Sequence, residues 1–272
     1  MSGRVVLQDI VKVYRSGSGL FRGKTSVRAV DHVDIMLEPG ETLGIVGESG
    51  SGKSTLGRIA AGIESPTSGH VSLDGRSYAR IGSAAWRRER RGVQMIFQNP
   101  SKALDPRMTI GAQIGEAMQA HRLSDTQGRK ARMEEMLALV GLPGMGGRYS
   151  HQLSGGQQQR AVIARALVLE PRVVVCDEAV SALDVSVQAQ IINLLNDLKA
   201  RFGIGYLFIS HDLGVVRHIS DRIAVMQKGV IVETGRAAEI FANPKHDYTR
   251  SLLAAVPAAT PAERRARERR IA

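Results

Sequence analysis

Residues 42–63 restrict the fold more than any other part of the sequence. Thr42 to Val46 is a short apolar run that predicts a buried strand, and Ser54 to Ile63 has the pattern of a helix. The loop between them reads GESGSGKS over residues 47–54. Its glycines allow successive backbone N–H groups to turn inward, and the start of the following helix adds positive potential. The sequence therefore predicts a phosphate-binding loop in an α/β fold.

An acidic pair follows a second apolar run, in the sequence VVVCDE at residues 173–178. A strand of this type lies inside a parallel sheet, and ligands bind at the carboxyl ends of such strands. With a phosphate loop in the same chain, Lys53 would reach the β- and γ-phosphates of a nucleotide. Ser54 and Asp177 would then hold Mg²⁺, and Glu178 would orient and deprotonate the attacking water. Without the loop, an acidic pair at this position would more often cap a helix.

A second phosphate-binding device is predicted about 100 residues after the first. Residues 153–157 read LSGGQ and precede a helical segment, with Ser154 as a good N-cap and Gly155 and Gly156 allowing close backbone approach. One nucleotide does not need both devices within a monomer. Two chains packed head to tail would use each pair across their interface.

Composition narrows the classes of partner. The chain carries a formal net charge of +11, which fits either a well-solvated surface or a polyanionic partner. Its single cysteine, Cys176, excludes a disulfide framework and a four-cysteine metal site made by this chain alone. No stretch approaches the roughly 20 apolar residues that span a bilayer, and the N-terminus lacks the apolar block of a signal peptide. We therefore expect any membrane role to be peripheral.

The pattern along the chain changes between residues 99 and 150, where periodic helical segments interrupt an alternation of strands and helices. This stretch predicts a helical insertion in an α/β framework. Residues 16–26 are expected to form a Gly/Ser-rich loop or hairpin tip. Strands are predicted at residues 4–14, 30–37, 42–46, 70–73, 93–97, 172–176, 206–209, 223–226 and 230–232. Helices are predicted at residues 54–63, 110–120, 128–141, 155–169 and 187–202.

Together these motifs resemble the ATP-binding subunit of ABC transporters over nearly the whole chain. The resemblance implies ATP and Mg²⁺ as ligands and a P-loop NTPase fold, namely a RecA-like α/β core with an antiparallel β subdomain and a helical subdomain. It implies an ATP-binding domain over residues 4–255 with the helical subdomain at about 99–150. The implied nucleotide-binding residues are Tyr14, Gly47, Glu48, Ser49, Gly50, Ser51, Gly52, Lys53, Ser54, Thr55, Ser154, Gly155, Gly156, Gln157 and Asp184. The implied catalytic residues are Glu178, His211, Gln98 and Lys53, and the implied metal-binding residues are Ser54, Gln98 and Asp177.

Finer detail resembles the peptide and nickel importers of this family. The segment NPKHDYTRSLLAAVP at 243–257 is similar to their C-terminal extension, although it also fits a capped helix with Tyr248 on a surface turn. Some members carry a cysteine cluster after this extension, and the tail at 258–272 has none. We expect this basic tail to be disordered and either solvated or in contact with anionic lipid.

The resemblance also implies the partners and the location. The partners are two transmembrane permease subunits, a second ATP-binding subunit, and indirectly an extracytoplasmic solute-binding protein. The second ATP-binding subunit is either a related, different chain, which we favour, or another copy of this one. The expected location is the cytoplasmic face of the bacterial inner membrane. Dipeptides or oligopeptides are the expected cargo, with nickel, glutathione or another small solute as alternatives. A soluble ATPase acting on nucleic acid or ribosomes is a remote alternative.

Overall fold

A mixed six-stranded sheet forms the centre of the molecule in a computed structural model that describes residues 3–16, 25–123 and 125–255. Its strand order is β10-β9-β3-β8-β7-β6, and the strands are parallel except β10, which pairs antiparallel with β9. The bounds are β3 Thr42–Val46, β6 Val93–Ile96, β7 Val173–Asp177, β8 Gly205–Ile209, β9 Arg222–Gln227 and β10 Val230–Arg236. Every residue of β3, β7 and β8 is buried, as expected of continuous apolar runs in a covered parallel sheet. The predicted α/β class is confirmed.

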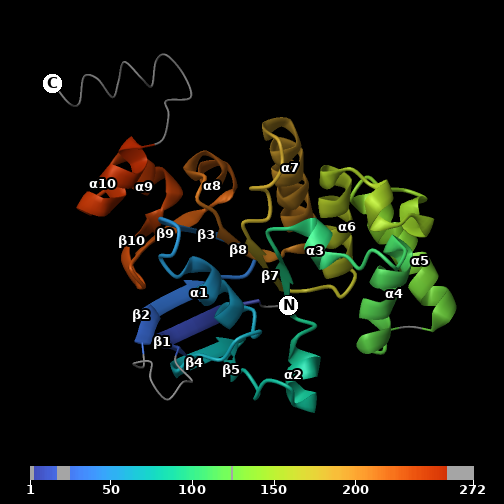
Figure 1. Cartoon of the computed structure of the whole chain (residues 1–272), viewed down its shortest axis with the longest axis horizontal. Coiled ribbons are helices and arrows are strands. Elements are labelled where there is room, and N and C mark those ends of the chain that lie inside the picture. The colour runs from blue at the N-terminus through green and yellow to red at the C-terminus, as the bar shows by residue number, and fades with distance from the viewer. Residues whose placement is uncertain (1–2, 17–24, 124, 256–272) are drawn as a thin grey trace.

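A four-stranded antiparallel sheet lies beside the central one, in the order β2-β1-β4-β5 (Figure 1). Its strands are β1 Val5–Ser16, β2 Thr25–Leu37, β4 Ser68–Leu73 and β5 Arg76–Ser77. Helix α1, Lys53–Ala60, contacts strands of both sheets, and its Leu56 and Ile59 are fully buried. This helix therefore joins the two sheets through one hydrophobic core.

A group of helices projects to one side of the central sheet, in green and yellow-green in Figure 1. It comprises α3 Pro100–Ala103, α4 Ile110–Ala120, α5 Thr126–Leu139 and α6 Gly155–Leu167. Side-chain caps set the starts of these helices: Thr109 caps α4 and Asp125 caps α5. The cap at Asp125 explains why α5 begins two residues earlier than the apolar pattern predicted.

The remaining helices are α2 Ala84–Glu89, α7 Val185–Phe202, α8 Leu213–Ile219, α9 Ala237–Ala242 and α10 Asp247–Ala254. Helix α7 begins at Val185 and not at the predicted residue 187, because Asp184 caps it. The surface turn considered for Tyr248 is wrong: this residue lies in the first turn of α10 and is only 9% exposed. The predicted loop at 16–26 falls largely outside the described residues, as does the tail at 258–272.

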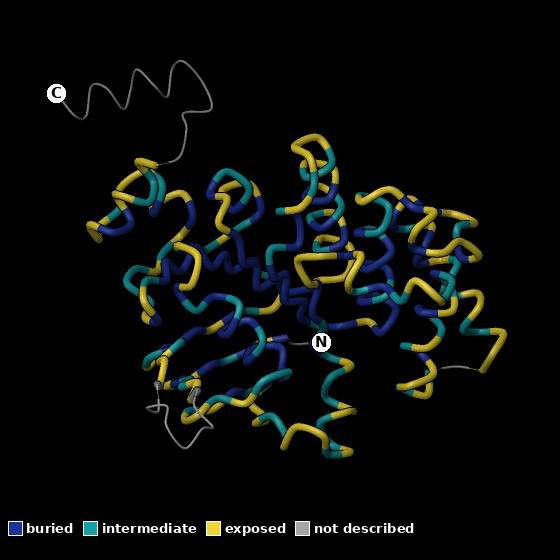
Figure 2. The backbone as a smooth tube through the Cα atoms, viewed as in Figure 1, coloured by how far each residue is buried: buried dark blue, intermediate teal, exposed yellow. Residues whose placement is uncertain are grey.

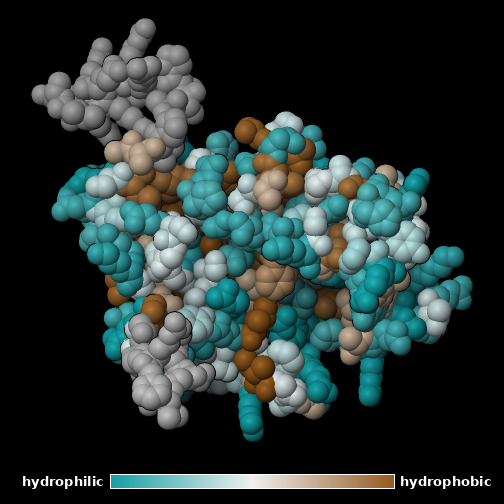
Figure 3. Space-filling view, in the orientation of Figure 1, coloured by the Kyte–Doolittle hydropathy of each residue, from teal (hydrophilic) through white to brown (hydrophobic). Residues whose placement is uncertain are grey.

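The core follows the strands of the central sheet and continues into the helical group, while exposed residues concentrate on helix surfaces and loops (Figure 2). On the face in Figure 3, hydrophobic side chains of the described residues gather in separate groups and not in one continuous patch. Among the described helices, none is long and apolar enough to cross a membrane.

Gly44 in β3 offers a test of how tightly this sheet is covered. A Cβ at this position would lie 2.5 Å from Ser220 Oγ and 2.7 Å from Val216 Cγ1, where α8 crosses the strand. We predict that Gly44→Ala lowers the free energy of unfolding by about 1–3 kcal/mol, measured by urea denaturation.

Gly115→Ala in α4 is the matched control, because open space surrounds its Cβ position. It should raise the free energy of unfolding by about 0.5–1 kcal/mol, since alanine favours a helix over glycine. A Gly44→Ala protein as stable as the parent would contradict the packing described here.

Candidate functional site

The loop at residues 47–52 joins β3 to α1 at the carboxyl edge of the central sheet. Gly47, Gly50 and Gly52 all have positive φ, at 151°, 78° and 105°. A Cβ on Gly47 would overlap the carbonyl oxygen of Met226, and one on Gly52 would overlap that of Ala29. The backbone angles favour glycine at all three positions. At Gly47 and Gly52 the close approach to two other strands requires it as well.

Lys53 is buried at the start of α1, and its ammonium group turns back onto the loop. Nζ donates hydrogen bonds to the carbonyl oxygens of Gly47 at 2.8 Å and Glu48 at 2.7 Å. Burial lowers the pKa of Lys53, although the nearby carboxylates Glu178, Asp177 and Glu48 act in the opposite direction. The positive charge of Lys53 therefore lies beside the loop. The first N–H groups of α1, which follows the loop, have no intrahelical partners.

Asp177, the last residue of β7, meets the first turn of α1. Its Oδ1 accepts a hydrogen bond from Ser54 Oγ at 2.8 Å. Burial raises the pKa of Asp177 and Glu178 adds to this, while Ser54 opposes it. A carboxylate and a hydroxyl at this spacing suit Mg²⁺, which takes one or two protein oxygens and completes its shell with water and phosphate oxygens. The residues predicted for the metal therefore fit it, except that Gln98 lies against Glu178 instead.

Glu178 is the point where three of the predicted catalytic side chains converge. Its Oε2 accepts a hydrogen bond from Gln98 Nε2 at 2.8 Å and lies 3.4 Å from His211 Nδ1. Gln98 and His211 follow β6 and β8, the two neighbours of β7, so parallel strands bring these residues to one edge. Glu178 also has a φ of 50°, a left-handed conformation that is uncommon for glutamate and is often found at functional sites.

The LSGGQ segment begins α6, away from the phosphate loop. Ser154 Oγ accepts a hydrogen bond from Gln157 N at 3.3 Å, and Gln157 Oε1 accepts one from Ser154 N at 2.9 Å, which forms a capping box. A Cβ on Gly156 would lie 2.6 Å from Val187 Cγ1 of α7. In Figure 1, α6 lies to the right of β7 and α1 to the left, so the helices that follow the two devices lie on different sides of this strand.

Asp184 and Tyr14 have local partners in this chain. Asp184 accepts hydrogen bonds from Val187 N and Ser186 Oγ, both at 2.9 Å, and these lower its pKa. Tyr14 Oη donates to Glu64 Oε1 at 2.6 Å and lies 3.4 Å from Thr55 Oγ1, beside the first turn of α1. Tyr14 is 39% exposed. The predicted nucleotide-binding roles of Asp184 and Tyr14 stay predictions.

Tyr248 is a neighbour of the phosphate loop that the sequence does not predict. Tyr248 Oη accepts a hydrogen bond from Glu48 N at 2.9 Å, across 200 residues of sequence. The segment containing Tyr248 resembles the C-terminal extension of peptide importers, but no local pattern indicates that it reaches the phosphate loop.

Comparison with known proteins adds independent evidence. Residues 30–181 match the family described as ABC transporter, and residues 232–272 match the one described as oligopeptide/dipeptide transporter, C-terminal region. A putative peptide import ATP-binding protein of Brucella abortus is 49% identical over 92% of this chain and 76% of the relative. The oligopeptide transport ATP-binding protein AppF of Bacillus subtilis is 48% identical over 92% of this chain and 77% of its own length. OppD of Mycobacterium tuberculosis is 49% identical over 96% of this chain but only 43% of its own length.

Solved structures agree with these relatives. The cbiO1 protein of Clostridium perfringens, part of the cbiONQ transporter complex, superposes with a TM-score of 0.75 at 25% identity and covers 88% of this chain and 90% of its own. The cassette MJ0796, a dimer in a post-hydrolysis state bound to ADP and Pi, gives 0.74 at 28% identity over 86% of this chain and 98% of its own. Since the ABC transporter match alone spans more than half of the residues, the chain belongs to the ATP-binding proteins of the ABC transporter family.

Proposed function

We propose that this ATPase energises the uptake of dipeptides or oligopeptides by a multi-subunit ABC importer. The observation that carries the proposal is the match of residues 232–272 to the C-terminal region of oligopeptide and dipeptide transporters, because this region lies outside the motifs that all such ATPases need. The relatives from Brucella and Bacillus, named as peptide import and oligopeptide transport ATP-binding proteins, support it. Glutathione is a second candidate cargo, because glutathione import proteins of Pectobacterium and Shigella are 48–49% identical to this chain.

The phosphate loop would hold ATP through charge and backbone donors. Incoming phosphate oxygens would replace the carbonyls of Gly47 and Glu48 as partners of Lys53, and the first N–H groups of α1 would donate to them. Ser54 and Asp177 would hold Mg²⁺, which neutralises phosphate charge when bound. This arrangement stabilises charge and needs no covalent nucleophile.

Glu178 would take the proton from the attacking water. Gln98 Nε2 already donates to its carboxylate, and His211 lies on the same side, so both can hold the carboxylate and the water in line with the γ-phosphate. The left-handed backbone of Glu178 accompanies a side chain that lies against Gln98 and His211.

The second phosphate device requires a second chain. We propose that Ser154, Gly155, Gly156 and Gln157 bind the γ-phosphate of the ATP held by a partner ATPase, and that Asp184 contacts the partner's site. The MJ0796 cassette, which is a dimer, supports such a pairing. A different ATP-binding subunit is the proposed partner. The helical segment at 99–150 would dock on two permease subunits at the cytoplasmic face of the inner membrane, with a solute-binding protein on the far side.

Glu178→Gln tests the base assignment. We predict that phosphate release by the assembled transporter falls at least about 100-fold, because a carboxamide cannot accept the proton. Binding of fluorescent N-methylanthraniloyl-ATP should stay within about twofold of the parent. Glu239→Gln on the exposed surface of α9 is the control and should keep the parental rate. Parental turnover by the Glu178→Gln protein would show that another group activates the water.

Co-purification tests the partners and the cargo. We expect the tagged full-length chain, extracted from native membranes in detergent, to bring with it two multi-span permeases and a second ATPase. The ATPase rate of this complex, reconstituted with its solute-binding protein, should rise with dipeptides or oligopeptides and not with glutathione or NiCl₂. If the ATPase rate rises only with glutathione or only with nickel, that solute replaces peptides as the proposed cargo. Recovery of ribosomes or nucleic acid without membrane protein would contradict the proposed importer function.

A further inference from the structure

The segment at 244–250 is the one sequence motif that the ATP site described above does not use. Its Tyr248 is buried in the first turn of α10, and its hydroxyl oxygen accepts a hydrogen bond from Glu48 N at 2.9 Å. Glu48 belongs to the phosphate loop. The C-terminal region is therefore in direct contact with the nucleotide site.

The turn that carries Tyr248 is held from several sides. The Glu233 carboxylate of β10 accepts hydrogen bonds from Lys245 N at 2.8 Å and His246 N at 3.0 Å. His246 Nδ1 accepts one from Tyr248 N at 3.1 Å and so caps α10. Arg250 Nη1 donates to Lys245 O at 2.9 Å. These bonds fix where the tyrosine hydroxyl lies relative to the central sheet.

One peptide group of the loop connects Tyr248 to the phosphate-binding lysine. In the peptide that links Gly47 to Glu48, the N–H donates to Tyr248 Oη and the carbonyl accepts from Lys53 Nζ at 2.8 Å. Hydrogen bonds at the two ends of one peptide polarise each other. The orientation of this peptide therefore depends on Tyr248 at one end and sets the position of Lys53 at the other.

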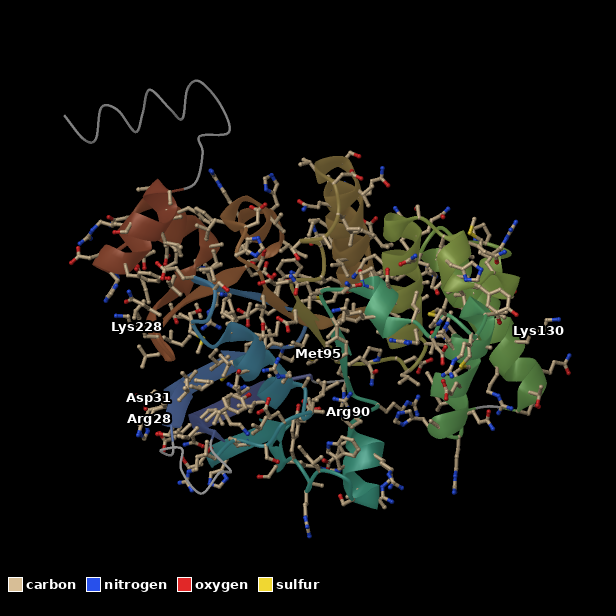
Figure 4. All side chains as sticks on the ribbon, viewed as in Figure 1. Arg28, Asp31, Arg90, Met95, Lys130 and Lys228 are labelled. Carbon is tan, nitrogen blue, oxygen red and sulfur yellow. The ribbon has the colours of Figure 1, made fainter. Side chains whose placement is uncertain are left out.

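On the opposite side of the loop, backbone hydrogen bonds connect Ser51 to the neighbouring strands. Gly229 N, in the turn between β9 and β10, donates to Ser51 O at 3.0 Å, and Asp31 N of β2 donates to Gly229 O at 2.8 Å. Figure 4 shows Lys228, the neighbour of Gly229, on the same side of the molecule as Asp31 and Arg28. Tyr248 therefore holds one side of the loop through its side chain, and a chain of backbone hydrogen bonds holds the other side.

We propose that Tyr248 is a positioning residue for ATP binding. Its hydroxyl holds the Gly47–Glu48 peptide in the phosphate-receptive orientation before the nucleotide arrives, so that less conformational freedom is lost on binding. This inference rests on the ATP site proposed above. It gives the C-terminal region of this chain a role in nucleotide affinity.

Tyr248→Phe in the full-length chain tests the proposal, with N-methylanthraniloyl-ATP and Mg²⁺ as the probe. Loss of one hydrogen bond that orders the loop should weaken the affinity about two- to tenfold. Tyr78→Phe is the matched control, because Tyr78 Oη donates to Ala60 O at 2.8 Å at the far end of α1. Both variants should lower the melting temperature, but only Tyr248→Phe should change the affinity.

A second variant and a second measurement separate an effect on ATP affinity from a general loss of protein stability. Glu233→Ala, which frees the turn but leaves the hydroxyl, should weaken ATP binding in the same direction. ATP should slow amide hydrogen exchange in residues 247–254 of the parent and not of Tyr248→Phe. Parental or tighter affinity in Tyr248→Phe would overturn the inference. Failure of the parent itself to bind the probe would instead overturn the proposed ATP site.

Discussion

The close approach of the phosphate loop to two backbone carbonyls is the constraint on which the site depends. Gly47 lies against Met226 of β9, and Gly52 lies against Ala29 of β2, with no room for a Cβ at either position. The loop is therefore shaped by the central sheet and the antiparallel sheet together. Helix α1, which packs against strands of both sheets, begins directly after this loop, so its first N–H groups lie beside the loop without intrahelical partners.

The residues proposed for catalysis depend on the parallel strands in the same way. Gln98, Glu178 and His211 come from segments far apart in the sequence, yet each follows one of three adjacent strands. Parallel pairing alone brings them within hydrogen-bonding reach. The LSGGQ segment instead lies at the start of α6, where Ser154 and Gln157 bond to each other's backbone N–H groups in a capping box. One chain therefore carries two separate devices, which fits the proposed pairing of two ATPases around each nucleotide.

Local patterns made much of this predictable. The strand before Gly47, the buried strand before Asp177 and the cap at Ser154 each have a signal within a few residues. The contact of Tyr248 with Glu48 does not, because it joins residues 200 positions apart and depends on how β10 and α10 pack. The same holds for the bond from Tyr14 to Glu64 and for the placement of Gln98 on Glu178 instead of on the metal ligands. Tertiary packing decides such contacts, and composition cannot reveal them.

In the proposed assembly, each ATP lies between the phosphate loop of one ATPase and the LSGGQ segment, residues 153–157 here, of another. Its most direct test is the structure of the assembled transporter with a slowly hydrolysed ATP analogue. We expect the γ-phosphate to form hydrogen bonds with Lys53 of one cassette and with the LSGGQ segment of the opposing cassette. A nucleotide bound by Lys53 while Ser154, Gly155 and Gly156 face solvent or a permease would contradict it.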